Sequence, residues 1–452
     1  MLLKIPRRLT LTPEGFIYWF AAFNGLAYYA CVLLINQILP FEKGILRFGT
    51  SLIFLLIAVF FYLRHKQRIF TLKKQQWPIA IHVMFAYFGW SVLSFTWSNT
   101  QDFQAQGYSL TIFYLAQWVN YFIEFLTILI ICKVTTASQL ALHYLKGLRL
   151  GGLILAAAYL FVWIFIEKSG RLSTVGEGVL VIHPNNLALK LAISSLCSFH
   201  LFAIKPNKRQ KDILTVALFG IPTLFAMMLT VGKTVLVAFM VAFLFYILHI
   251  PLQRRMKLPI LIVTLLVMCM GLPFVAEYMS RYLDAGSLNT LSGRTELWQI
   301  TWDDSWKHPW IGHGIASPFA TLSWNVDRSG QSGTAHNDYL NAFYQMGVIG
   351  FLIVSLLYGS FINAAFKTRK NAEFRQNTSF CMALFIIMFI FSLTASFPVG
   401  FAVPFTFQMI MHYWMAQADA STPKIRFAHP PVNPFDVEND SPSTPNNRKA
   451  LA

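Results

Sequence analysis

Long apolar runs recur along the chain, and each is long enough to cross a lipid bilayer as a helix. The runs 110–131, 148–167 and 213–231 each hold about 20 residues with few charges, the length that the hydrocarbon core demands. Inside lipid every backbone N–H and C=O group needs a partner within the protein, and a helix supplies all of them locally. Only 12% of the residues are charged, about half the fraction usual in soluble domains. The sequence therefore predicts an all-α polytopic membrane protein.

We predict about twelve membrane spans, one long loop and a tail. The spans lie near 16–36, 45–63, 77–96, 110–131, 148–167, 186–204, 213–231, 233–250, 258–276, 346–364, 379–396 and 398–416. They make a membrane domain of residues 1–418, which contains one long external loop, 277–345, with short helices of its own. The tail, 419–452, is rich in Pro, Asn and Ser, so we expect it to be disordered and cytoplasmic.

The positive charges are distributed unevenly across the predicted spans. Most of the 36 Lys and Arg fall on one side, in segments such as 64–74 and 205–212. This asymmetry predicts that this side, with both termini, lies in the cytoplasm. The first apolar run is too long for a signal peptide, so we expect it to be a retained span. The net charge of +17 thus favours membrane lipids as partners and not nucleic acid.

Cationic residues near the external boundary suit an anionic ligand at the membrane surface: Arg171, Lys190, Lys233 and Arg294. Lys233 begins a span, where the helix dipole favours phosphate, although a lysine that merely reaches the interface is the alternative. Its "GKT" is no nucleotide-binding loop, because Met227 occupies the place of the required first glycine. Arg294 is either a solvated first-turn residue or a planar donor to a diphosphate.

The loop is predicted to hold two helical segments separated by a turn. The first, "SGRTELWQITWDDSW", has Ser292 or Gly293 as N-cap and Glu296 in its first turn. "HPWIGHGIASPF" (308–319) then ends it with Pro and Gly residues. We expect a second helix from Ala335 onward.

The triplet His336-Asn337-Asp338 lies at the start of that second helix. Helical spacing predicts that His336 shares a face with Leu340 and Phe343, while Asn337 and Asp338 lie on neighbouring faces. An imidazole here could act as a general base near neutral pH, or be a hydrogen-bonded interface histidine. Asp338 and Glu296 are alternative bases, and Asp338 otherwise has a supporting or surface role. A metal site at His336 would recruit His308, His313, Asp303 or Asp338, but no HxxxH or HxH spacing joins them, so we expect no metal. We also expect no cofactor.

Glu124 is the one carboxylate predicted deep in the bundle. It could mark a proton path in a transporter, but a hydrogen-bonded structural role is the better interpretation.

These motifs resemble the O-antigen ligase/O-antigen polymerase superfamily. The resemblance lies in "SGRTELWQITWDDSWKHPWIGHGIASPF", in "AHNDYLNAFYQMGVIGF", and in "HPNNLALKLA" at the entry to a span. Lys233-Thr234 is similar to the exopolysaccharide polymerases of the superfamily. The resemblance covers about 170–360 and the general topology.

The resemblance implies a transmembrane glycosyltransferase domain, 1–418, in the bacterial inner membrane with its active face in the periplasm. It would transfer a glycan from an undecaprenyl-diphosphate-linked donor to a hydroxyl of a glycan or lipid A–core acceptor. The enzyme would act as polymerase or ligase in O-antigen, capsule or exopolysaccharide biosynthesis, with inversion and without a metal.

The roles implied by the resemblance follow the matching positions. His336 and Arg294 would be catalytic, with His336 activating the acceptor hydroxyl. The diphosphate would be bound by Arg294 and Lys233, with Arg171 and Lys190 beside them. Asn185, Asn186, Asn337 and Asp338 would support the site. The alternative function is a polysaccharide or lipid transporter or flippase, for which internal repeats and intramembrane ion pairs would be expected.

Overall fold

The computed structural model describes a set of helices with the short connections between them. The described residues are 12–23, 43–69, 79–98, 104–105, 108–135, 137–167, 184–205, 210–230, 232–250, 257–266, 269, 294–317, 335–368 and 375–394. Arg171, the predicted span 398–416 and the tail 419–452 lie outside them, as does much of the predicted loop 277–345.

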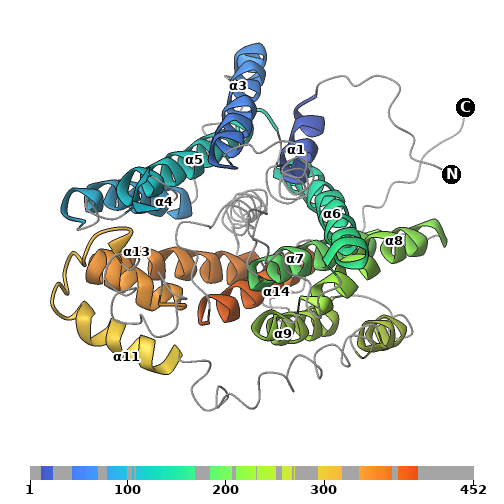
Figure 1. Ribbon diagram of the computed structural model, residues 1–452. Coiled ribbons are helices and arrows are strands. Elements are labelled where there is room, and N and C mark those ends of the chain that lie inside the picture. The colour runs from blue at the N-terminus through green and yellow to red at the C-terminus, as the bar shows by residue number, and fades with distance from the viewer. Residues whose placement is uncertain are drawn as a thin grey trace, which may run out of the picture.

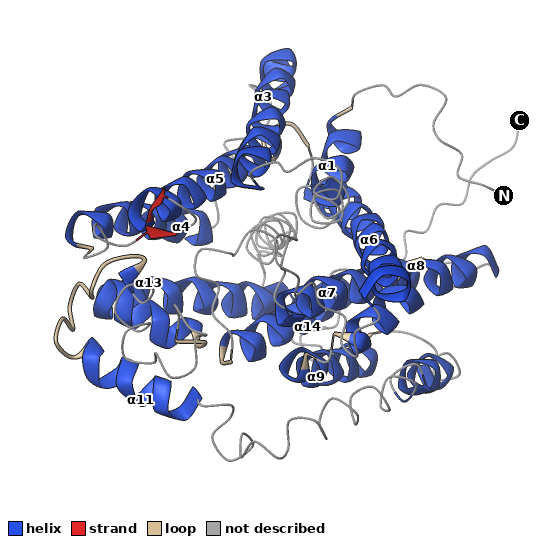
Figure 2. Cartoon of the chain, in the orientation of Figure 1, coloured by secondary structure: helices blue, strands red, loops and turns tan. Residues whose placement is uncertain are grey.

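The described structure is almost entirely helical (Figures 1 and 2). Its helices are α1 (Pro13–Ala22), α3 (Lys43–Ile69), α4 (Ile79–Ser94), α5 (Leu110–Ile131), α6 (Ala137–Val162), α7 (Pro184–Ala203), α8 (Gln210–Leu229), α9 (Lys233–His249), α11 (Arg294–Ser305), α13 (Asp338–Thr368) and α14 (Arg375–Ser392). Short helical turns, Phe95–Trp97 and Trp163–Glu167, extend α4 and α6, and Lys257–Leu266 is a further short helix. Strands β1 (Gln104–Ala105) and β2 (Tyr108–Ser109) form one small antiparallel pair.

Seven of the described helices are long and apolar enough to cross a membrane. They are α4 to α8, α13 and α14, while α9 is shorter. Large apolar side chains such as Leu63, Leu214 and Leu356 are exposed, as lipid-facing residues would be. The all-α membrane architecture is thus confirmed. The count of twelve spans, the domain boundaries and the external location of the loop stay predictions.

Two helices begin elsewhere than the sequence predicted. Helix α6 begins at Ala137, eleven residues before the predicted span at 148, because buried residues already repeat at helical spacing there: Leu140, Ala141, Tyr144 and Leu145. Helix α13 begins at Asp338, before the predicted span at 346 and after the predicted helix start at Ala335. The second difference changes the interpretation of the candidate site.

The core lies where α6, α7, α8, α9 and α14 pack on one another, while α3 pairs with α5 and α4 with α13. Helix α11 lies beside α13 (Figure 1). Glu124 is buried and accepts hydrogen bonds from Asn120 Nδ2 at 3.1 Å and Ser51 Oγ at 3.4 Å. These bonds agree with its structural interpretation.

Candidate active site

Helix α13 breaks at Gly347, whose φ of 64° and ψ of −165° lie outside the helical region. The rings of Tyr339 and Tyr358 are 5.7 Å apart. In a straight helix these two residues would be about 28 Å apart along the axis. The first limb, 338–346, therefore doubles back toward the second limb, 348–368.

A break of this kind removes the helical partners of the backbone groups on both sides of it. The turn His308–Gly314, which we name the HPWIGHG turn, supplies new ones. Its backbone bonds to α13 run from His313 N to Tyr344 O at 2.9 Å, from Gly314 N to Gln345 O at 2.9 Å, from Val348 N to Pro309 O at 2.8 Å and from Ile349 N to Trp310 O at 3.5 Å. On the opposite side, Trp90 Nε1 of α4 donates to Met346 O at 3.1 Å. The turn thus acts as a splint across the break.

Two glycines make this close approach of the two backbones possible. Gly312 and Gly347 both have positive φ, 70° and 64°. A Cβ on Gly312 would lie 2.4 Å from the Gln345 carbonyl carbon, and one on Gly347 would lie 2.3 Å from the carbonyl of Trp310. Because any side chain would force the two backbones apart, the motif needs glycine at both places.

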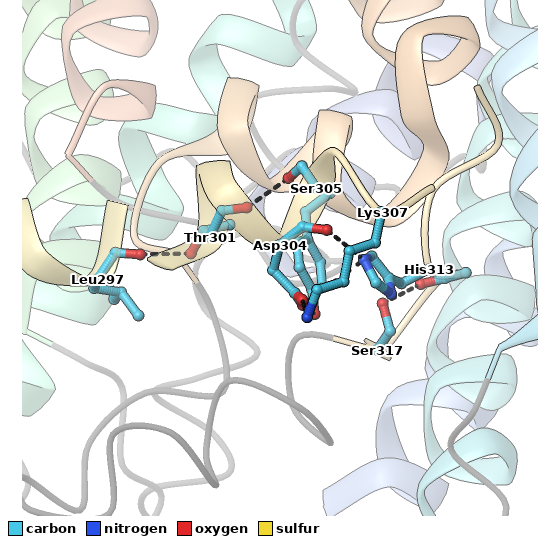
Figure 3. A network of polar contacts seen from close by, with 9 residues as sticks. Leu297, Thr301, Asp304, Ser305, Lys307, His313 and Ser317 are labelled. Carbon is cyan, nitrogen blue, oxygen red and sulfur yellow. Dashed lines mark hydrogen bonds and ion pairs between the residues drawn. The ribbon is translucent and has the colours of Figure 1, made fainter. Parts of the chain in front are cut away.

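Side chains reinforce the splint (Figure 3). Asp304, near the end of α11, accepts hydrogen bonds from Tyr344 Oη and Lys307 Nζ, both at 2.7 Å. The His313 ring stacks on the Tyr344 ring at 4.4 Å, and its Nε2 donates to the Asp304 carbonyl oxygen at 3.0 Å. The His308 ring meets His313 edge-on at 4.8 Å.

The electrostatics of this network favour a charged Asp304 beside a neutral His313. Burial raises the pKa of Asp304, but hydrogen bonds from Lys307 and Tyr344, together with the charge of Lys307 and of a His313 ring protonated at acid pH, outweigh burial and hold that pKa below its ordinary value. For His313, burial is the largest effect and lowers the pKa despite the nearby Asp304. This network was not predicted from the sequence, although "WDDSWKHPWIGHG" places all its loop residues close together.

His336 lies just before α13 in a left-handed conformation, with φ of 50°. Both of its neighbours are fixed. Ala335 O accepts from Trp298 Nε1 of α11 at 2.8 Å, and Asn337 Oδ1 caps α13 by accepting from the amides of Tyr339 and Leu340, each at 3.1 Å. The predicted shared face of His336, Leu340 and Phe343 is therefore wrong, because the helix begins only at Asp338. The turn, and not helical spacing, sets the direction of the His336 side chain.

Asp338 is buried, with 6% of its surface exposed. It lies close enough to Tyr87 of α4 and Tyr358 of the second limb to interact electrostatically with both. The surface role predicted as one option is therefore wrong, because the first limb turns this residue inward between α4 and the second limb.

The starts of α7 and α9 meet. Lys233 is the exposed first residue of α9, after the N-cap Gly232. A Cβ on Gly232 would lie 3.3 Å from Asn185 Oδ1 at the start of α7. Asn186 is its partly exposed neighbour, and Lys190 lies further along α7, partly buried. The structure thus brings Asn185 to the first turn of α9.

The last part of α14 connects this pair of helix starts to the start of α13. Thr394, just after α14, donates to Thr234 Oγ1 of α9 at 2.9 Å. Phe389, five residues earlier, packs on Tyr339 of α13 with ring centroids 5.8 Å apart. The N-termini of α7, α9 and α13 therefore gather around one end of α14. Helix N-termini carry partial positive charge, which favours an anion, although the end of α14 beside them is its C-terminus and carries the opposite partial charge.

Arg294 is the first residue of α11, one turn before Trp298, and is partly buried. Burial lowers its pKa from 12.5, but the guanidinium stays charged at physiological pH. The bond from Trp298 to Ala335 brings the helix of Arg294 to the turn of His336. Among the described residues, no three His, Cys, Asp or Glu side chains form a set that could hold a metal ion.

Comparison with protein families gives one match. Residues 217–355 match the family model described as O-Antigen ligase. The matched stretch is less than a third of the chain and includes Lys233, Arg294, the HPWIGHG turn and His336. The match confirms the resemblance to the O-antigen ligase/polymerase superfamily. No curated protein matches the chain.

Proposed function

We propose, from the match of residues 217–355 to the O-antigen ligase family model, that this chain transfers a glycan from an undecaprenyl-diphosphate-linked donor to an acceptor hydroxyl. The family match itself indicates a glycosyltransferase of polysaccharide biosynthesis in a membrane. Our proposal adds three points to this: a lipid-linked donor, an acceptor hydroxyl on a glycan or on lipid A–core, and an active face on the periplasmic side of the inner membrane.

The observation that carries the proposal is the gathering of helix N-termini around the end of α14. Lys233 begins one of these helices, and Asn185 lies beside its cap. Helix N-termini and a lysine suit a diphosphate, because amide N–H groups and the dipole both attract phosphate oxygens. Arg294 adds a planar guanidinium, which binds two phosphate oxygens at once. Lys190, and Arg171 outside the described residues, are assigned to the same anion on the resemblance alone.

In this mechanism His336 is the general base. It takes the proton of the acceptor hydroxyl as that oxygen bonds to the anomeric carbon of the donor sugar. The bond from this carbon to the diphosphate oxygen breaks, its electron pair stays on that oxygen, and undecaprenyl diphosphate leaves. Attack from the face opposite the leaving group inverts the anomeric configuration. Because diphosphate is already a good leaving group, the scheme asks the protein for charge neutralisation and positioning, which the cationic groups supply without a metal.

The fixed backbone around His336 supports this role. Trp298 holds Ala335 on one side, and Asn337 caps α13 on the other, so the histidine is held in a left-handed turn. Backbone conformations of this kind cost free energy and cluster at functional sites. Asn337 would thereby support the base, and buried Asp338 would support the first limb from inside.

A transporter would share one feature with this structure, the broken helix α13. In transporters the groups freed by such a break coordinate the substrate or an ion. Here the carbonyls of Tyr344, Gln345 and Met346 accept bonds from the HPWIGHG turn and from Trp90. The break serves the protein's own packing, which favours glycan transfer over transport.

The test compares Arg294→Ala and His336→Ala with His249→Ala, an exposed histidine at the opposite end of α9 from Lys233. Each variant is expressed in a deletion strain, and surface glycan is examined on a gel at matched expression. We expect both site variants to lose transfer and His249→Ala to retain it. Undiminished glycan in His336→Ala would contradict the proposed mechanism.

The same gel separates the possible reactions. Single repeat units on the acceptor in the deletion strain indicate a lost polymerase. Long polymer that stays on the lipid carrier indicates a lost ligase. Unchanged glycan trapped inside the cell would indicate transport and overturn the proposal.

A further inference from the structure

Helix α11 and the turn residues Trp306 and Lys307 that follow it present three rows of residues, each spaced by four. Within the helix, residues at this spacing lie along one side. The inner row, which is buried toward α13, is Leu297, Thr301 and Ser305. The middle row is Trp298, Trp302 and Trp306, and the outer row of exposed polar residues is Gln299, Asp303 and Lys307. An aromatic row thus runs along the helix between a buried edge and a polar edge.

Two tryptophans of the middle row, Trp302 and Trp306, are held in place by packing and are still about half exposed. Trp302 is 50% exposed and Trp306 is 54% exposed. Their rings meet at 5.5 Å, nearly perpendicular, and both pack against the buried ring of Phe343 at 5.7 and 5.5 Å. Phe343 belongs to the first limb of α13, whose position the splint fixes. The rings of Trp302 and Trp306 therefore form a supported platform, which we name the tryptophan platform.

The platform continues from the proposed diphosphate site. Arg294 lies one turn before Trp298 in the same row, and Trp298 bonds to Ala335 beside His336. Each step of four residues advances about 6 Å along the helix, comparable with the length of one sugar residue. A glycan whose diphosphate lies at Arg294 would therefore meet Trp302 and Trp306 with successive sugars further along.

The surroundings of the platform fit a sugar better than lipid. Hydrogen-bond donors and acceptors lie beside the rings, on Gln299, Asp303 and Lys307. A sugar whose C–H face stacks on an indole ring could therefore form hydrogen bonds to them through the hydroxyl groups at its edge. A helix that lies in a bilayer interface needs a broad apolar face. The exposed side of α11 itself carries Glu296, Gln299 and Asp303, with Trp302 as its large apolar residue. In the turn that follows, Trp306, Trp310 and Ile311 are also exposed, so the exposed apolar residues are few and interrupted by polar ones.

We propose that the tryptophan platform is an extended subsite for the glycan of the lipid-linked donor, and that it makes the enzyme prefer donors that carry several sugars. This inference rests on the proposed function, because the platform is placed relative to Arg294 as the diphosphate site.

The first experiment measures binding without turnover. The probe is oligosaccharide released by mild acid from the strain's own surface glycan, titrated into the purified full chain while the heat of binding is measured by calorimetry. We expect saturable binding that weakens roughly tenfold in the double variant Trp302→Ala/Trp306→Ala, as the loss of two stacking contacts predicts. Trp302→Phe/Trp306→Phe keeps aromatic faces and should restore most of the affinity. The matched control is Trp19→Ala, which removes another exposed tryptophan, in α1 near the start of the chain. This variant should bind the oligosaccharide normally.

The second experiment compares transfer from donors with one sugar and with several sugars on the same lipid diphosphate. The double alanine variant should raise KM roughly tenfold for the longer donor and leave the single-sugar donor unchanged. Equal effects on both donors, or no effect, would overturn the platform while leaving glycan transfer intact. If the protein binds oligosaccharide but transfers none, the tryptophan platform is supported as a glycan-binding site and the proposed glycan transfer is contradicted.

A third measurement tests lipid as the occupant. Tryptophan fluorescence is measured in vesicles that contain brominated lipid, for the wild type and for the double phenylalanine variant. The difference between the two gives the quenching of Trp302 and Trp306. Strong quenching of these two rings would place them in the bilayer and overturn the proposal. Folding of the double alanine variant is checked by thermal unfolding. If it does not fold, the single variants Trp302→Ala and Trp306→Ala carry the test, and normal oligosaccharide binding in both would overturn the proposal.

Discussion

Two histidines show how differently two regions of this protein use the same side chain. His200 lies inside α7, fully buried, stacked on Phe380 at 4.0 Å with its Nδ1 2.9 Å from Tyr246 Oη. His336 lies in a left-handed turn and is partly exposed. The first ring is part of a packed interior made of continuous helices. The second is held by its backbone just before a broken helix, in a position that leaves it partly exposed.

The backbone shows the same difference. All the residues with positive φ in the described part of the chain lie between Gly312 and Gly347: Gly312, Gly314, Ala316, His336 and Gly347. The interior around α7, α9 and α14 contains none of them. Strained backbone persists only where surrounding contacts enforce it, and it tends to accompany function. The α11–α13 region is therefore built for positioning, and the α7–α9–α14 interior for packing.

The largest expected effect is on the rate of glycan transfer, when each of the two histidines is replaced by a side chain that cannot act as a base. His336→Gln should lower the rate of glycan transfer at least about 100-fold, the usual contribution of a general base. His200→Phe should keep the stack on Phe380 and transfer normally per folded molecule, but unfold at lower temperature because Tyr246 loses a partner. The measurements are donor turnover and thermal unfolding in detergent. Equal rate losses in both variants would remove the distinction between the two regions.

The next effect concerns the splint. Gly347→Ala should destabilise the protein by at least about 2 kcal/mol, because the new Cβ meets the Trp310 carbonyl and the residue keeps a positive φ. Gly359→Ala lies in the same helix with open space around its Cβ, so it should be neutral or stabilise by up to about 1 kcal/mol. Chemical unfolding in detergent compares them. A stable Gly347→Ala protein would show that the two backbones can separate without cost.

A smaller effect is expected from the cap of α13. Asn337→Ala removes the acceptor of two amide bonds and should cost about 1 kcal/mol, while Asn337→Asp should restore most of it. Thr12→Ala removes the cap of α1, whose Oγ1 accepts from Gly15 N at 3.1 Å, and should cost a similar amount. Transfer activity per folded molecule should fall only for Asn337→Ala, because only this cap fixes the turn of His336. Equal activities would show that the turn keeps its geometry without the cap.

The smallest effect is a pH dependence of the splint. The folded protein binds a proton on His313 more weakly than the unfolded chain does, because burial lowers the pKa of this residue below 6.5. Stability should therefore be full above pH 6.5 and fall as the pH drops toward the lowered pKa. His313→Phe keeps a ring stacked on Tyr344 but removes the titrating group. When the unfolding temperature is measured against pH, the decrease below pH 6.5 should therefore be smaller in this variant. A wild-type profile no steeper than that of the variant would contradict this role of His313.

Much of the fold follows from local sequence patterns. The apolar runs located α4, α5, α7, α8, α9 and α14 to within four residues, because a helix in lipid satisfies its own backbone and needs only its own residues. They also located the start of α3, which continues six residues beyond the predicted end at 63. Glu296 in a first turn and the end of α11 before Pro309 were likewise predicted from local chemistry. The residues Arg294, Lys233 and His336 were selected by their types and by the resemblance of their motifs, and their catalytic roles remain predictions.

The sequence by itself determined that this is a helical membrane protein with a glycine-rich turn and a polar helix start on one loop. The tertiary structure decided that α13 doubles back at Gly347, that His336 precedes the helix instead of joining it, and that Asp338 is buried. The physical reason is that a broken helix is stable only when other groups bond its freed N–H and C=O groups. Those partners are Pro309, Trp310, His313 and Gly314, over thirty residues earlier in the chain, together with Trp90 of α4. Periodicity within one segment cannot encode bonds between segments, so only the folded chain shows where the histidine is held.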